Sequence, residues 1–195
     1  MTAESWTGLS DDLVRAAAAA TPITRSSRTD DIPVTWDERT VLTTMLDYVR
    51  DTVHVKCAGL TDEQARRAPL PSSPLTTISC LVGHLRRVEY YWIRIVLLGE
   101  RDHAPTATDD DPDPEMRLAL EVPLARLLAE YRASCDQLRQ LVAPLDLDTA
   151  SRGTLSWRSE PVTLRWVLMH LIEETARHNG HIDILREMAD GVTGM

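Results

Sequence analysis

The stretch WVLMHLIEETARHNGHIDILREM, from Trp166 to Met188, decides the fold of this chain. Residues three and four apart in it form one continuous helix face, because an α-helix repeats every 3.6 residues. Both ends of this face are aliphatic, whereas its centre holds one carboxylate and two imidazoles. The seam consists of Val167, Leu171, Glu174, His178, His181, Leu185 and Met188. The sequence therefore predicts a long core-facing helix with ionisable groups at mid-length.

Those ionisable groups predict a metal site on the same helix. A buried charge is costly unless a partner charge or a metal ion compensates it. Glu174 and His178 are four residues apart, so their side chains lie about 5–6 Å apart on one face. His181 is a further donor one turn on, and His170, one turn before Glu174, is a candidate to orient a ligand. The alternative interpretation is a solvent-facing helix edge that carries ordinary histidines.

Composition limits the classes of function. The 195 residues, 43% hydrophobic and 26% charged, are typical of one soluble globular domain. A net charge of −9 argues against nucleic acid or an anionic membrane as a partner. No run approaches the roughly 18 apolar residues of a membrane span, and no secretory signal is visible. We therefore expect a cytoplasmic protein whose three unpaired cysteines are reduced and buried in helices.

Four long amphipathic stretches predict helices, and no stretch alternates convincingly as a strand. The first helix is expected to begin at a capping box of Thr35 and Glu38, and the last at Ser159, with Pro161 near its first turn. Residues 101–114 form the one long loop, rich in proline and acid. The helices should cover residues 36–57, 75–98, 122–143 and 161–189. The sequence thus predicts an all-α four-helix bundle over residues 35–195, with one crossover loop.

Residues 1–34 look separate from this bundle. A short helix capped by Ser10 is expected from Asp11 to Ala20. Residues 21–33 are rich in Ser, Thr, Arg and Asp and contain two prolines, which favours a linker. We expect an N-terminal arm that is partly helical or flexible; a functional lid and an arm exchanged between two subunits are the alternatives.

A histidine on the second predicted helix adds a possible third ligand. His84 stands between Leu81 and Val88, on the edge of an apolar face. Alone it would be an ordinary core histidine. Together with the motif Glu174-Thr-Ala-Arg-His178-Asn-Gly-His181, however, it resembles the DinB-like superfamily, in which a histidine of helix two joins two ligands on the last helix.

The second motif departs from the commonest form in that superfamily, which is His-x-x-x-His-Arg-Gly-Gln. Here Glu174 takes the place of the first histidine, His178 that of the second, and His181 stands where the glutamine would be. A glutamate at the first position is similar to the motif of the mycothiol-dependent maleylpyruvate isomerase branch. The residues of both motifs look most like those of actinobacterial DinB-like proteins. The resemblance covers about residues 36–192 and leaves out the arm.

The resemblance implies a divalent ion held by His84, Glu174 and His178. Three protein ligands leave an open coordination position, at which an ion lowers the pKa of a bound thiol or water. We expect Zn²⁺, although Ni²⁺, Mn²⁺ and Fe²⁺ suit the same donors. The resemblance also implies a low-molecular-weight thiol substrate such as mycothiol or bacillithiol.

The leading hypothesis is a metal-dependent S-transferase, or a thiol-dependent isomerase, that acts on a small electrophile and forms a homodimer. His181 should sit beside the ion and exchange a proton. Four arginines are candidates to contact a carboxylate or sugar on the ligand: Arg86, Arg87, Arg94 and Arg177. Arg87 and Arg177 are the two leading candidates. The alternatives are a non-catalytic metal-binding or stress-response bundle and a metal hydrolase that uses an ion-bound water.

Overall fold

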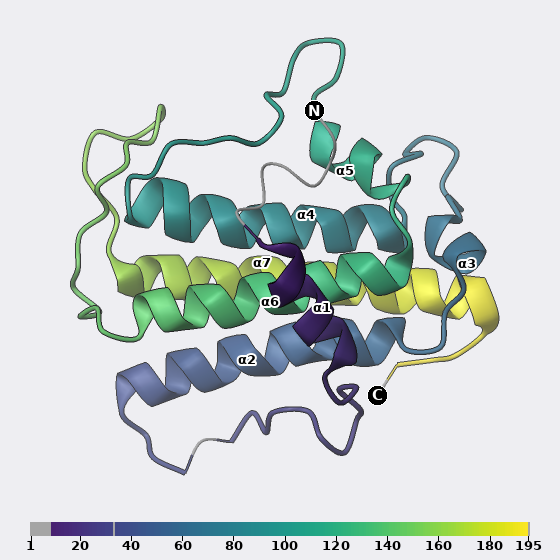
Figure 1. Ribbon diagram of the computed structural model, residues 1–195, viewed down its shortest axis with the longest axis horizontal. Coiled ribbons are helices and arrows are strands. Elements are labelled where there is room, and N and C mark those ends of the chain that lie inside the picture. Colours follow the sequence, from purple (N-terminus) through teal and green to yellow (C-terminus); the bar gives the residue numbers. More distant parts are fainter. Residues whose placement is uncertain (1–8, 33, 195) are drawn as a thin grey trace.

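Four long helices lie side by side and form the body of the protein (Figure 1). The computed structural model describes residues 9–32 and 34–194, and this part contains helices and loops but no strand. α2 packs against α7, and α4 packs against both α6 and α7. The bounds are α1 Asp11–Ala19, α2 Glu38–Cys57, α3 Asp62–Arg66, α4 Ile78–Tyr90, π-helix η1 Tyr91–Leu97, α5 Pro114–Ala119, α6 Leu124–Val142 and α7 Leu164–Asp190. The predicted all-α bundle is confirmed.

The core is divided along the bundle into two apolar clusters. On α7, Leu171 belongs to one cluster and Ile182 to the other, and the buried residues between them are Thr175 and Asn179. The Asn179 amide donates to the Val49 carbonyl of α2 at 2.8 Å. A polar layer therefore crosses the middle of the bundle, where the predicted site lies. None of the described helices is both long and apolar enough to cross a bilayer.

The buried face of α7 departs from the predicted seam in its second half. His181 is exposed and Met188 is 46% exposed, whereas Ile182 is fully buried. A seven-residue spacing drifts by about 20° per heptad on a straight helix, because such a helix has 3.6 residues per turn. The prediction of one continuous core-facing seam was thus wrong at His181 and Met188, whereas Leu185 between them is buried as predicted.

Two predicted helix starts were also wrong. The N-cap of α2 is Asp37, whose carboxylate accepts from the Thr40 amide at 3.0 Å. The Thr35 hydroxyl donates to the Asp37 carboxylate at 2.7 Å and forms no box with Glu38. An aspartate is at least as good an N-cap as a threonine, and in this helix Asp37, rather than Thr35, accepts the hydrogen bond from the first turn.

The last helix begins five residues after Ser159, with Thr163 as its N-cap. Two backbone hydrogen bonds hold the preceding segment extended: Ser151 donates to the Val162 carbonyl at 2.7 Å, and Leu164 donates to the Thr149 carbonyl at 2.9 Å. Because residues 162–164 pair with residues 149–151, the helix begins at Leu164 and not near Pro161 as expected.

The second long helix changes from α to π geometry at Tyr91. The amides of Arg152 and Gly153 donate to the carbonyls of Leu97 and Val96, at 3.0 and 2.8 Å, and so tie the loop after α6 to this segment. A Cβ on Gly153 would lie 2.2 Å from the carbonyl oxygen of Ile95. Only glycine fits this close approach.

Replacing Gly153 by alanine is therefore expected to lower the free energy of unfolding by about 1–3 kcal/mol, a typical cost of overpacking. Gly180→Ala is the matched control, because a Cβ there meets nothing within 4 Å. It should instead raise that free energy by about 0.5–1 kcal/mol, since glycine is unfavourable inside a helix. Denaturant unfolding of both variants tests this, and equal effects would contradict the close approach.

The N-terminal segment lies on the outside of the bundle. α1 starts at the Ser10 cap and crosses α6 (Figure 1). Further on, the Thr29 amide and hydroxyl both donate to the Asp51 carboxylate of α2, at 2.8 and 2.7 Å. The division of the chain into an arm and a bundle at residue 34 stays a prediction.

Candidate metal centre

Three donors from two helices converge near the middle of the bundle. His84 comes from α4, and Glu174 and His178 come from successive turns of α7. One ligand atom of each lies within 4.8 Å of the other two. The Nε2 atoms of His84 and His178 lie 3.4 and 3.5 Å from the same carboxylate oxygen, Oε1 of Glu174. The structure thus brings together the three residues that the sequence singled out.

These distances fit a shared ion. Two ligand atoms each about 2.1 Å from a tetrahedral ion are about 3.4 Å apart, which is the spacing found here. A direct hydrogen bond between an imidazole and a carboxylate is usually shorter, about 2.7–2.9 Å. The side chains are partly sheltered, with exposures of 25%, 15% and 13% for His84, Glu174 and His178. The donor set can therefore hold a divalent ion that a small molecule can still reach.

The electrostatics of the three groups differ. Burial alone lowers the pKa of His84, but hydrogen bonds to Glu115 and Glu174 outweigh it and raise that pKa. Burial alone raises the pKa of Glu174, but the His84 hydrogen bond and the charge of His178 lower it overall. Burial and the charge of His84 together lower the pKa of His178. The carboxylate is thus held ionised and His178 favours its neutral, metal-binding form.

Glu115 is a site residue that the sequence analysis missed. Its Oε1 lies 3.3 Å from Nδ1 of His84, the ring nitrogen that faces away from Glu174. Such a carboxylate orients the imidazole and sets which nitrogen carries the proton. Glu115 lies on α5, between the predicted loop of residues 101–114 and the helix predicted from residue 122, where no element was expected. Pro114 at the first helical position was the available signal for that helix.

The other two predicted histidines occupy different surroundings. Nδ1 of His181 lies 3.2 Å from Nδ1 of His178, on the side of that ring away from Glu174. His170 instead packs on aromatic rings, with ring centroids 4.5 Å from Trp92 and 5.0 Å from Trp166. The supporting contact to a ligand that was predicted for His170 is made by Glu115 and His181.

A cavity of about 440 Å³ adjoins the donor set. His84 and Glu115 stand at its wall, and Arg87 lines it while paired with Asp102 of the loop after η1. Aromatic and aliphatic side chains supply much of the remaining surface, among them Val88, Tyr91, Trp92 and Pro105. The volume is within the range of about 300–1,000 Å³ usual for small-molecule sites.

Arg177 has a different position from Arg87. It is 57% exposed on α7, pairs with Glu173 and approaches Oε2 of Glu174 at 3.7 Å. It does not line the cavity beside His84. Of the two leading arginines, only Arg87 is therefore placed to touch a ligand in that cavity.

The chain itself offers no reactive thiol at this centre. Cys57, Cys80 and Cys135 are all free and buried, as predicted. Burial raises the pKa of the Cys57 thiol to about 12 and also raises that of Cys135. A thiolate taking part in chemistry beside His84 must therefore come from a bound molecule.

Comparison with known proteins agrees with this arrangement. No individually curated protein is similar enough to count as a relative. The sequence model of the family described as Mycothiol-S-transferase, however, matches residues 41–191. This match contains α4, α5, α6 and α7 and hence all three donors. The resemblance seen in the motifs is confirmed: the chain belongs to the mycothiol S-transferase family, within the DinB-like superfamily.

Proposed function

We propose that the protein joins a mycothiol-type thiol, through its sulfur, to a small electrophile, with a divalent metal ion held by His84, Glu174 and His178. The observation that carries the proposal is the placement of three donors at ligand spacing, one of which, His84, lines a cavity large enough for a small molecule. Family membership supports the thiol as one substrate.

The donor set leaves a coordination position open, and a bound divalent ion there would favour the thiolate at neutral pH. Zn²⁺ fits two imidazoles and a carboxylate, as do Ni²⁺, Mn²⁺ and Fe²⁺. In the transfer the thiol loses its proton, and its sulfur forms a bond to an electrophilic carbon as the leaving group departs. Glu115 keeps His84 oriented for its part in the site.

The cavity supports a catalytic role over a purely structural metal site. Structural sites are closed by four protein ligands, whereas among the described residues three donors converge and His84 faces a cavity. In our proposal the aromatic wall of Tyr91 and Trp92 holds the apolar part of the electrophile, and Arg87 contacts a carboxylate or sugar. Arg177 would act only on ligand parts that extend along α7. The homodimer and the cytoplasmic location remain predictions.

The role of His181 is open to a direct test. Its contact with Nδ1 of His178 supports orientation of that ring, and its exposure leaves it able to exchange a proton with solvent. His181→Ala is expected to retain one equivalent of metal and to lower kcat by about 10- to 100-fold, as loss of an outer ligand contact commonly does.

His181→Gln separates orientation from proton exchange. Glutamine can keep a hydrogen bond to His178 but cannot titrate. If proton exchange is the main role, the glutamine variant should be as slow as the alanine variant. Recovery of the rate by glutamine would assign His181 to positioning alone, and loss of metal from His181→Ala would place it among the ligands.

The proposed activity is tested with the full chain stripped of metal and then reloaded with Zn²⁺, Ni²⁺, Mn²⁺ or Fe²⁺. Mycothiol and a chromogenic aryl halide are supplied, and thioether formation is measured. The rate should require both the metal and the thiol and should fall when cysteine replaces mycothiol. An equal rate in metal-free protein would contradict the proposal. Metal-dependent consumption of the halide without thiol would instead support the hydrolase.

A further inference from the structure

A second cavity, of about 320 Å³, opens on another part of the bundle. It lies among the first half of α2, the end of α6 and the first turns of α7, and it shares no lining residue with the cavity beside His84. Arg39, Arg50, Arg139 and Asp47 form its polar wall, and Leu46 and Leu168 contribute apolar surface. The cavity thus combines positive charge with a hydrophobic floor.

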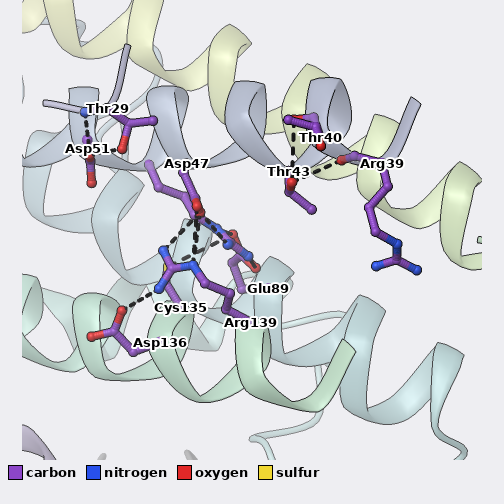
Figure 2. Close-up of polar contacts among 11 residues, drawn as sticks. Thr29, Arg39, Thr40, Thr43, Asp47, Asp51, Glu89, Cys135, Asp136 and Arg139 are labelled. Atoms are coloured by element: carbon purple, nitrogen blue, oxygen red, sulfur yellow. Dashed lines mark hydrogen bonds and ion pairs between the residues drawn. The ribbon is translucent and has the colours of Figure 1, made fainter. Parts of the chain in front are cut away.

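Two of the three arginines are held in place by carboxylates. Arg50 makes two hydrogen bonds of 2.6 Å to Glu89 and also approaches Asp47 at 3.3 Å. Arg139 contacts Asp47 at 2.8 Å and Asp136 at 2.6 Å, and Figure 2 shows its guanidinium between these two carboxylates. Both guanidiniums are therefore pre-positioned, which reduces the entropy that a ligand must remove.

Arg39 is the arginine of this cavity whose charge is not offset by a described carboxylate. It stands in the first turn of α2, and Figure 2 shows its side chain leaving the helix on the same side as Asp47. Its guanidinium donates to the Leu145 carbonyl, and within the described chain it has no carboxylate in ion-pair distance. A guanidinium offers five N–H donors, so most of those on Arg39 are available to a ligand.

We propose that this cavity binds a small organic anion, a monocarboxylate with an apolar body. The carboxylate meets the fork of Arg39, which matches its planar geometry. The charge of Arg139 is already offset by Asp47 and Asp136, so Arg39 supplies the attraction. The apolar body packs against Ala143, over the cavity floor formed by Leu46 and Leu168. The volume limits the ligand to roughly the size of a short-chain or single-ring acid. Asp47 disfavours a ligand with more than one negative charge, so inorganic phosphate should bind less well.

Calorimetric titration of the full-length protein with phenylacetate tests the proposal. Saturable binding at one site is expected, whereas 2-phenylethanol, which lacks the charge, and acetate and inorganic phosphate, which lack the apolar body, should bind much more weakly. Arg39→Gln should weaken phenylacetate binding by about tenfold or more, because a charge-assisted pair is lost. Arg158→Gln, which removes an exposed arginine from the loop at residues 149–163, is the matched control and should change nothing.

The location of the probe is decided with His178→Ala. This variant should bind phenylacetate as the unaltered protein does, because His178 does not line the second cavity. The proposal is overturned if phenylacetate shows no saturable binding, if Arg39→Gln binds it unchanged, or if His178→Ala loses it. Equal affinity for inorganic phosphate would also overturn the assignment to a carboxylate with an apolar body.

Discussion

His178→Ala is expected to weaken Zn²⁺ binding by about 100- to 1,000-fold, since a few ligands share the whole free energy of metal binding. Thiol transfer should be lost with the metal. The reason lies in the geometry: Nε2 of His178 lies 3.5 Å from the Glu174 oxygen that also faces His84, so its removal leaves two donors. Metal content after dialysis against a buffered Zn²⁺ series measures the change.

His84→Ala and Glu174→Gln should have similar effects, because each also removes one of the three donors. His103→Ala is the matched control, as His103 is exposed on the loop after η1. If His103→Ala lost as much metal as His178→Ala, the assignment of the ligands would be wrong. A loss of activity with full metal content would show that His178 acts on the substrate and not on the ion.

Arg50→Met is expected to destabilise the fold by about 3–5 kcal/mol, the cost of leaving a buried charge without its partner. Arg50 and Glu89 are 5% and 1% exposed and are joined by two hydrogen bonds of 2.6 Å. Burial lowers the pKa of Arg50, but the charge of Glu89, a contribution from Cys135 and the Glu89 hydrogen bond together outweigh burial and raise that pKa overall. Arg50 therefore stays charged, and its burial depends on compensation by Glu89. Denaturant unfolding measures the loss.

The double variant Arg50→Met/Glu89→Leu should recover most of that stability, because an apolar pair of similar volume carries no desolvation cost. Residual instability is expected from Asp47, which loses one arginine but keeps Arg139 at 2.8 Å. If the double variant were less stable than Arg50→Met, the ion pair would be a net stabiliser and the argument from desolvation would fail.

The four long helices could be predicted from the sequence because hydrophobic periodicity is a local property. The α-helical spacing also puts Glu174 and His178 on one face, since residues four apart meet on any helix. The bounds of the helices were less certain. Asp37 and Thr163 cap α2 and α7 where other residues were expected, because several side chains near each end can accept the same amide hydrogen bond.

The site itself depended on residues far apart in the chain. His84 reaches Glu174 across 90 positions, and no periodicity on α4 distinguishes it from an ordinary core histidine. Here the resemblance to a known superfamily supplied what periodicity could not. Glu115 is positioned beside His84 by α5. That helix has six residues, too few for an amphipathic pattern to be recognised.

The chain by itself therefore determined the all-α class, the run of helices and the pair of donors on α7, because each follows from spacing within one segment. Only the tertiary structure decided which groups face the same space. It brought Glu115 to His84, turned His181 outward on α7, and packed His170 against Trp92 and Trp166. It also gathered the arginines of α2 and α6 around a second cavity. These outcomes depend on how helices rotate and pack against one another, and a rotation of a few tens of degrees about a helix axis is enough to move a side chain from the core to the surface.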